Sequence, residues 1–424
     1  MKEVEPGIAG RFDWWIRSGV LTLPLEMSVE PNPLPRLAPL QRVMLRDSLA
    51  AGNAGHHVEQ VEIVFARGLA GGRVVSAWAE TVARTEALRI AFLTGDGKPP
   101  SREFVEPRNL LNLEKTPPDS WQTWLDVDRL RPLLAPRAVP WRAVYWPRAG
   151  RFVWTFHHAL LDGRSIARIL RAFLERVAGR EADDLAIAGW RAPPAEMLAA
   201  AEGMFRGAFA NPEPVKLDLP CEPPAAGRAA RCLGNDFATR LESMAAAADV
   251  SAAAVVTWAW GQALAQTSGA AAVMVEQLRS GAPQEGTAGF TMNTLPLLIR
   301  RAAAGGVEKS LRELRARLQA LRAIESVSAA DFPPGVFPDM DRSSSGVIMV
   351  ERGTLRHLAG EVANGELVES LVLHESRGES LMATAHVVPD LRLEVEGPGR
   401  HFLLDAWTGV LEAGLSWGSH GVAT

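Results

Sequence analysis

The stretch "FVWTFHHALLDGRSIARIL", Phe152 to Leu170, decides the fold. Its apolar run ending in two histidines is typical of a buried strand, and beyond Asp162 and Gly163 the apolar residues recur with helical spacing. Neighbouring side chains on a strand point to opposite faces, so His157 and His158 should face different surroundings. The stretch therefore predicts a strand-to-helix junction that carries a base and an acid.

The chemistry of this junction leaves several roles open. Histidine is the natural general base near neutral pH. Asp162 could orient a histidine, cap the following helix or bind a cation, and Gly163 permits a tight turn or close approach of a substrate. No third metal-ligating residue has suitable spacing, so zinc is disfavoured. A second doublet, His56-His57, has no Asp-Gly after it, and we predict a surface pair.

Working outward, strand and helix patterns alternate along both halves of the chain, which predicts two α/β lobes. "WRAVYW" and "RFVWTF" are two strands joined by a tight turn, and a proline-rich stretch separates the halves. The expected divisions are an N-terminal extension over 1–33, an N-terminal lobe over 34–190, an inter-lobe connection over 191–230 and a C-terminal lobe over 231–424.

Composition narrows the class of protein. The 424 residues carry a formal net charge of -4 with acids and bases mixed, unlike the basic footprint of a nucleic-acid binder. Two cysteines fit a reducing cytosol. We see no signal peptide, and the mildly apolar stretch 251–265 is too short to span a bilayer. We expect a soluble, cytoplasmic monomer that binds neither membrane nor nucleic acid.

"HHALLDG" resembles the His-His-x-x-x-Asp-Gly signature of the condensation-domain superfamily of acyltransferases, which includes nonribosomal peptide synthetase condensation domains. Other family motifs follow in order: "LAPLQRVML", "ARTEALRIAF", "VPWRAVYW", "LDLPCEPPAAG" and "EQLRSGAPQEGTAGFTMNTLPLLIR". Thr85 and Ile90 depart from the second motif, and Leu278 replaces a glycine in the last. The "NTLPL" run favours the peptide-synthetase branch.

The resemblance implies an α/β fold with two chloramphenicol-acetyltransferase-like lobes in a V arrangement. Each lobe would hold a mixed sheet flanked by helices, with an active-site tunnel between them. His158 would be the catalytic residue and His157 a supporting one. Asp162 would be structural and pair with Arg279 across the lobe boundary through charge-assisted hydrogen bonds, and Gly163 would keep the tunnel open.

Three further side chains would line the substrate channel: Ser165, Asn293 and Ser345. Each has an alternative reading in the sequence. Ser165 is equally suited to a helix start, and Asn293 to backbone hydrogen bonds in its loop. Ser345 ends a serine run before a glycine and matches no family role.

The chain has neither an adenylation-type ATP loop nor a Gly-Gly-x-Ser carrier attachment site, so it resembles a free-standing condensation enzyme. Its acyl donor would be a phosphopantetheine thioester on a separate carrier protein, and its acceptor a small amine or alcohol, in nonribosomal peptide or polyketide biosynthesis. No permanently bound cofactor or metal is expected. Two alternatives stay open: a coenzyme A-dependent O- or N-acyltransferase, and a non-catalytic recruitment module.

Overall fold

The structure is a computed structural model, and it describes most of the chain. The described residues are 20–21, 34–53, 55–66, 69–94, 99–107, 110–190, 192–208, 219, 227–281, 285–303, 306–328, 331–332, 336, 347–351, 358, 367–375, 381–387 and 391–418. All statements about structure below concern these residues. Ser345 lies outside them, as does most of the predicted extension over 1–33.

The chain divides into two compact units. The first comprises Met1–Arg191, Pro283–Thr291 and Thr354–Arg377, and the second comprises Ala192–Ala282, Met292–Gly353 and Gly378–Thr424. The sequence did not predict that two short segments of the later chain belong to the first unit. The predicted boundaries at 34–190, 191–230 and 231–424 stay predictions.

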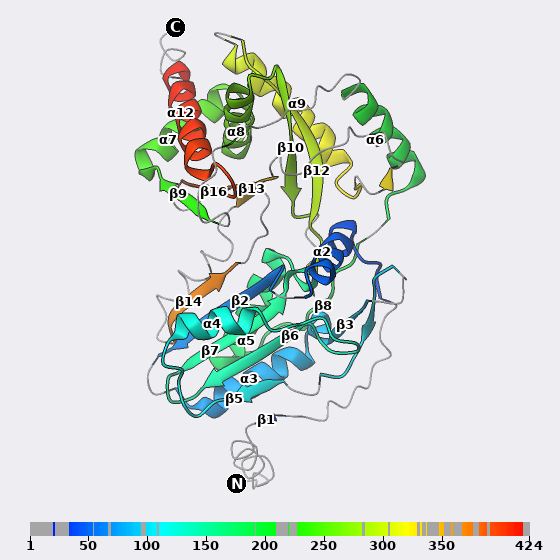
Figure 1. The fold of residues 1–424 in the computed structure, drawn as a ribbon, viewed down its shortest axis with the longest axis vertical. Coiled ribbons are helices and arrows are strands. Elements are labelled where there is room, and N and C mark those ends of the chain that lie inside the picture. The colour runs from blue at the N-terminus through cyan, green and yellow to red at the C-terminus, as the bar shows by residue number, and fades with distance from the viewer. Residues whose placement is uncertain are drawn as a thin grey trace. The chain divides into compact units, whose positions relative to one another are not determined.

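The first unit is built on a six-stranded mixed sheet. Its strand order is β1–β5–β6–β7–β2–β14, in which β5 and β6 are parallel and the other neighbours are antiparallel (Figure 1). The strands are β1 Val20–Leu21, β2 Val58–Phe65, β5 Leu111–Leu113, β6 Trp141–Trp146, β7 Arg151–His157 and β14 Val368–His374. Two smaller sheets pair β3 Ile90–Leu93 with β4 Ser101–Phe104, and β8 Ala186–Ile187 with β11 Thr287–Ala288.

Helices pack against this sheet around a large aromatic core. They are α2 Pro39–Ala50, α3 Gly71–Ala83, α4 Trp121–Arg129 and α5 Gly163–Val177, with 3-10 turns η1 Glu86–Arg89 and η2 His158–Leu160. The fully buried Trp78 of α3 lies edge-on to Phe152, Trp154 and Phe173, with ring centroids 5.0 to 5.4 Å apart. Edge-to-face contacts of this kind add to the hydrophobic stabilisation.

The second unit has its own six-stranded mixed sheet, in the order β12–β10–β13–β15–β16–β9. The strands are β9 Arg228–Cys232, β10 Ala272–Arg279, β12 Asn293–Arg300, β13 Val347–Glu351, β15 Met382–His386 and β16 Arg392–Glu396. The helices are α6 Ala195–Ala208, α7 Gly234–Ala247, α8 Ala252–Ser268, α9 Val307–Ala323 and α12 Arg400–Gly418. Helix α6 falls within the predicted connection over 191–230, which the proline-rich composition did not indicate.

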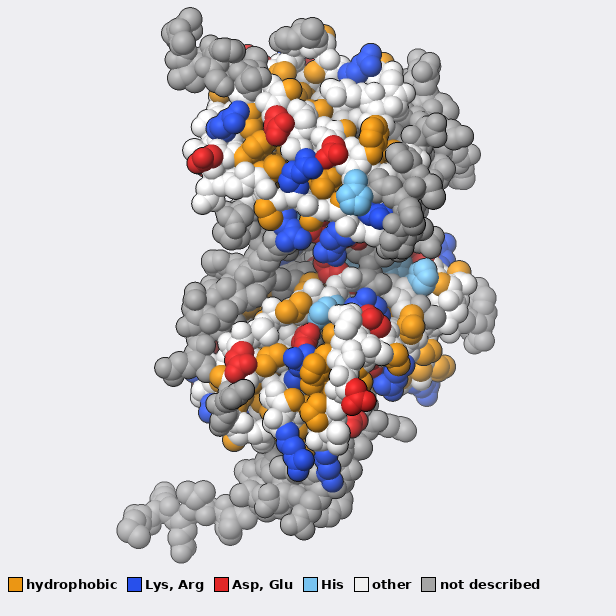
Figure 2. Space-filling model, turned by 60° about the vertical axis from the view of Figure 1, so that its left-hand side comes forward, with side chains coloured by type: hydrophobic (Ala, Val, Ile, Leu, Met, Phe, Trp, Pro, Cys, Tyr) orange, Lys and Arg blue, Asp and Glu red, His pale blue; other side chains and the backbone are white. Residues whose placement is uncertain are grey.

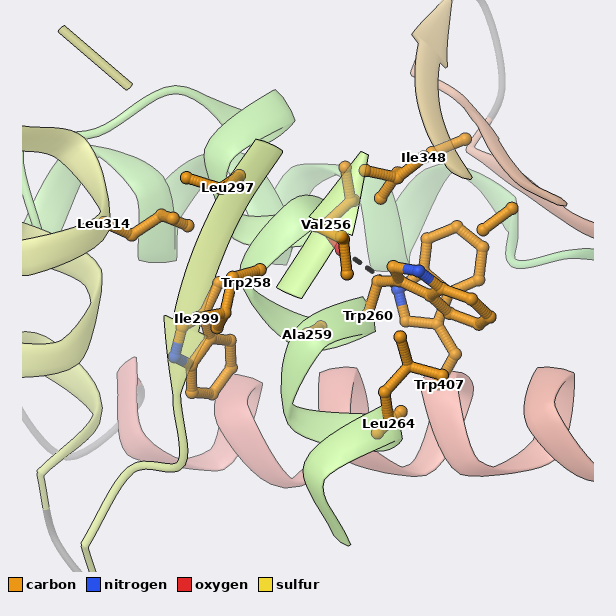
Figure 3. Close-up of a cluster of buried hydrophobic side chains, with 14 of the residues drawn as sticks. Val256, Trp258, Ala259, Trp260, Leu264, Leu297, Ile299, Leu314, Ile348 and Trp407 are labelled. Atoms are coloured by element: carbon orange, nitrogen blue, oxygen red, sulfur yellow. Dashed lines mark hydrogen bonds between the residues drawn. The ribbon is translucent and has the colours of Figure 1, made fainter. Parts of the chain in front are cut away.

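The core of the second unit is centred on α8 (Figure 3). Trp260 and Trp407 are fully buried with ring centroids 5.1 Å apart, and the indole nitrogen of Trp407 donates to the carbonyl of Val256 at 3.0 Å. Gly261 is required by close packing, because a Cβ atom there would come within 2.4 Å of Ile299. The predicted fold class, α/β with a mixed sheet and helices in each half, is confirmed.

On the face drawn in Figure 2, the described basic and acidic side chains are interspersed. Within the described ranges, no single helix is both long and apolar enough to cross a membrane, and the pair α7–α8, bent by 95°, meets those two criteria only jointly. The predicted V arrangement and tunnel stay predictions.

Candidate active site

The two histidine doublets lie next to each other in the first unit. Antiparallel pairing of β2 with β7 places Val58 opposite His157, so the residues before β2 run beside the end of β7. The amide of His158 donates to the carbonyl of His57 at 2.7 Å, and the rings of His57 and His157 are 6.2 Å apart. His56 is exposed as predicted, but the prediction of a surface pair is wrong for His57, which strand register brings into a half-buried position.

His157 is held by hydrogen bonds on both sides of its ring. Its Nδ1 accepts from the amide of Ala159 at 3.1 Å, so Nε2 carries the proton and donates to the Ser48 hydroxyl at 2.8 Å. Ser48 in turn donates to the carbonyl of His56 at 3.1 Å. The ring is fully buried, and desolvation, together with the charges of His57 and His158, lowers the pKa of His157 to about 3. His157 is therefore neutral at physiological pH.

His158 has different surroundings from His157, as predicted, but it lies in η2 directly after β7 and not within the strand. Its side chain is 20% exposed, and its Nδ1 lies 3.2 Å from Oε1 of Glu59, a buried residue of β2. This is an ion-pair distance without an aligned hydrogen bond. The ring of Phe290 packs edge-on at 5.8 Å. A partly exposed imidazole beside a buried carboxylate is equipped for proton transfer.

Asp162 caps α5, one of the three roles that the sequence left open. Its Oδ1 accepts from the amide of Ser165 at 2.9 Å, and its Oδ2 accepts from the amide and hydroxyl of Thr291 at 3.1 and 2.8 Å. The Ser165 hydroxyl accepts from the amide of Gly289 at 3.0 Å. Asp162 and Ser165 thus bind the segment 289–291 to the start of α5, directly after the histidines.

Gly163 needs no special backbone conformation, because its φ is not in the left-handed region. Apart from its chain neighbours and the backbone of its own helix, a Cβ atom at this position would meet no heavy atom of the described residues within 4 Å. Neither a tight turn nor protein packing therefore accounts for glycine here. Close approach of a substrate, the other role considered from the sequence, stays a prediction.

Arg279 and Asn293 belong to the second unit, where strand register pairs them across β10 and β12. Arg279 binds Glu325 through Nε and Nη2, at 2.8 and 2.5 Å, and Gln277 at 2.8 Å. The Asn293 amide donates to the carbonyls of Glu325 and Val327 at 3.1 and 2.6 Å. Asn293 therefore makes side-chain hydrogen bonds to backbone, as its alternative role predicted, but it lies in β12 and its acceptors belong to the segment after α9, not to a loop of its own.

The predicted pair between Asp162 and Arg279 joins residues of different units, and each has partners in its own unit. That pair stays a prediction. Among the residues that the structure describes, no group of three or more His, Cys, Asp or Glu side chains is arranged to hold a metal ion.

Glu59 is the residue of this site that sequence reasoning missed. Strand β2 is "VEQVEIVF", in which alternating apolar residues indicate a strand but no motif points to a role for the carboxylates. Glu59 stands two residues after His57 in a strand whose residues are nearly all buried. A charged residue in a buried strand needs a partner, so its presence was the available signal.

No protein-family model matches the chain. One of the proteins of linear gramicidin synthase from Brevibacillus parabrevis is 26% identical over 333 residues, which cover 70% of this chain and 4% of that protein. Nonribosomal peptide synthetase 30 from Fusarium vanettenii is 31% identical over 115 residues, 27% of this chain and 2% of that protein. The chain thus spans a small part of the length of these relatives.

Solved structures resemble the chain over nearly its whole length. The first condensation domain of the calcium-dependent antibiotic synthetase has a TM-score of 0.67 and 19% identity, covering 93% of this chain and 98% of that one. A variant starter condensation domain of rhizomide synthetase, in complex with C8-CoA, has a TM-score of 0.68 and 14% identity, with 90% and 94% covered. The epimerization domain of the third module of tyrocidine synthetase B has a TM-score of 0.66 and 13% identity, with 93% and 99% covered.

The chain has the fold of condensation domains. This agrees with the resemblance to condensation domains that the sequence motifs indicated. An epimerization domain shares the fold, so the reaction must be argued from the site.

Proposed function

We propose that this protein transfers an acyl group from a thioester to an amine or alcohol, with His158 as the general base. The observation that carries the proposal is the position of His158, which lies partly exposed at the end of β7 beside the buried carboxylate of Glu59. The intact His-His-x-x-x-Asp-Gly motif and the condensation-domain fold support the same chemistry.

In the proposed step, the acceptor nitrogen or oxygen attacks the thioester carbonyl carbon while Nε2 of His158 takes the acceptor's proton. The new C–N or C–O bond forms first, and the tetrahedral intermediate then collapses with loss of the sulfur. The proton on His158 passes to the departing sulfur, which leaves as a thiol. Base and substrate are held together, so proximity supplies a large part of the rate.

The donor that we propose is an acyl chain tethered by phosphopantetheine to a separate carrier protein, with the product an amide or ester in nonribosomal peptide or polyketide biosynthesis. The similarity to segments of two peptide synthetases supports this choice of donor. We place the reaction in the cytoplasm, since two cysteines in 424 residues suit a reducing compartment.

The first prediction tests the base. Purified protein, an acyl-loaded carrier and a panel of amines and alcohols are combined, and intact-protein mass spectrometry follows loss of the acyl group from the carrier. We expect acceptor-dependent unloading by the wild type and a roughly 100- to 10,000-fold slower rate for His158→Ala, the usual range for loss of a general base. The exposed His56 provides a matched control, and His56→Ala should unload the carrier at the wild-type rate.

Unloading by His158→Ala at the wild-type rate would contradict the assignment of the base. Tight binding of carriers with no turnover of any donor would instead favour the non-catalytic recruitment module.

A second candidate function is transfer of an acyl group from acyl-coenzyme A at the same site. It is favoured by the likeness to the rhizomide synthetase starter domain, whose structure is a complex with C8-CoA. Acyl-coenzyme A and acyl-carrier donors offered in competition separate the two functions, because the preferred donor is consumed first.

A further inference from the structure

We infer that Glu59 is a positioning residue for His158, acting on the Nδ1 side of the imidazole; this inference rests on the proposed function. Glu59 lies on β2 opposite Phe156 of β7, two residues before His158 in the chain. Its side chain is only 7% exposed, and Oε1 lies 3.2 Å from Nδ1 of His158. Glu59 is in β2, and His158 is the first residue of η2, directly after the neighbouring strand β7, so the pairing of β2 with β7 brings the two side chains together.

The other hydrogen bonds of the sheet do not account for Glu59. Within the described part of the chain, its Oε2 atom has no hydrogen-bond partner. Glu62, three residues along the same strand, is bound by both Arg151 and His374. A buried carboxylate is costly unless it is paired. Among the described residues, Oε1 of Glu59 has His158 within ion-pair distance.

The contact gives Glu59 two effects on proton transfer. By accepting a hydrogen bond from Nδ1–H, the carboxylate selects the tautomer in which Nε2 is the basic nitrogen. Once Nε2 has taken the acceptor's proton, the same carboxylate stabilises the imidazolium ion. The present geometry is close but not aligned, and catalytic hydrogen bonds often tighten only when substrate is bound.

Two titratable groups near His158 among the described residues, His57 and His157, do not supply this effect. His57, from the segment before β2, and His157, from β7, would each disfavour a second positive charge. Burial lowers the pKa of both, so both are neutral near pH 7. Asp47 of α2 lies 3.6 Å from Nε2 of His57. The segment 289–291 presents Phe290, which has no charge.

The second prediction tests Glu59→Gln, which keeps the shape and removes the charge. Nitrogen-15 NMR of the histidine side chains in the resting protein should show the pKa of His158 lowered by about one unit or more, as for loss of a nearby opposite charge. The Nε2-basic tautomer should lose its dominance. In acyl transfer, kcat should fall about 10- to 100-fold with little change in KM, and the acidic limb of the pH profile should move to lower pH.

Glu62→Gln is the matched control, because it removes a buried acid from the same strand and should leave the His158 pKa and tautomer unchanged. If Glu59→Gln folds poorly, Glu59→Asp serves instead; it keeps the charge but withdraws it from Nδ1, and should give a smaller shift in the same direction. An unchanged His158 titration in the Glu59 variants would overturn the inference. An NMR shift without acyl transfer by the wild type supports the Glu59–His158 contact and contradicts the proposed function, so the two failures are distinguishable.

Discussion

The two histidine doublets lie side by side at one end of the first unit's sheet, yet their members differ in partners and burial. His158 has a buried carboxylate at Nδ1, whereas His57 has Asp47, whose side chain is 54% exposed. His157 is enclosed and hydrogen-bonded on both nitrogens, whereas His56 is exposed. The difference shows that a histidine's role follows from its partners and burial, and not from the doublet itself.

The comparison also separates the two members of the motif. Burial keeps His157 neutral, and the hydrogen bond from the Ala159 amide fixes its tautomer, so His157 supports the chain where β7 ends. His158 retains contact with solvent and faces a carboxylate. Substitution of His157 should therefore act mainly on stability, and substitution of His158 mainly on turnover.

The third prediction has the largest expected effect on stability and concerns destabilisation of the fold at low pH. His157 has a pKa of about 3 in the folded protein and 6.5 as its reference value, so the unfolded state binds more protons between these values. The contribution of His157 to the free energy of unfolding is complete above pH 6.5 and is lost as the pH falls toward 3. The loss is on the order of 4 kcal/mol. Urea unfolding of the wild type and of His157→Gln, from pH 7 to pH 4, should give a shallower loss for the variant.

Other groups titrate over the same range, so His56→Gln provides the comparison. It should retain the full wild-type slope, because it removes an exposed imidazole and leaves the buried ring of His157 in place. Equal slopes for His157→Gln and the wild type would mean that His157 can take up a proton in the folded protein.

Local patterns predicted much of this arrangement. The apolar run before the histidines and the helical spacing after Gly163 correspond to β7 and α5 within a residue or two. Contacts between distant segments were not predicted: Thr85, one residue after the C-cap of α3, forms an isolated parallel bridge with Leu185. Such a bridge depends on a partner 100 residues away, and a sequence window contains no signal for it.

The residues of the candidate site also differ in whether they could be predicted from neighbouring sequence. His157, His158 and Asp162 were found because they are neighbours in the chain. Glu59 and Thr291 were not, because they reach the site through strand pairing and through the segment 289–291. His57 was misjudged for the same reason, since its burial is a consequence of the register between β2 and β7.

The fourth prediction tests how the two doublets are linked. Ser48 joins the ring of His157 to the backbone carbonyl of His56, and not to the His56 ring. Ser48→Ala leaves the buried Nε2–H of His157 without its acceptor and should lower the free energy of unfolding by about 1 to 3 kcal/mol. His56→Ala keeps the carbonyl and should change it by less than about 0.5 kcal/mol. Equal costs in urea unfolding would show that the link runs through the His56 side chain.

The last prediction has the smallest expected effect and concerns Asp47→Asn. Desolvation and the charge of His158 lower the pKa of His57, while Asp47 opposes this shift. Without the Asp47 charge the pKa of His57 should fall further, which proton NMR of the ring would measure. Stability should change by less than about 1 kcal/mol, because the pair is exposed on the Asp47 side. Turnover should be unchanged, since the ion-pair contact of Asp47 is with His57. A fall in turnover comparable to that of Glu59→Gln would mean that the first doublet also takes part in proton transfer.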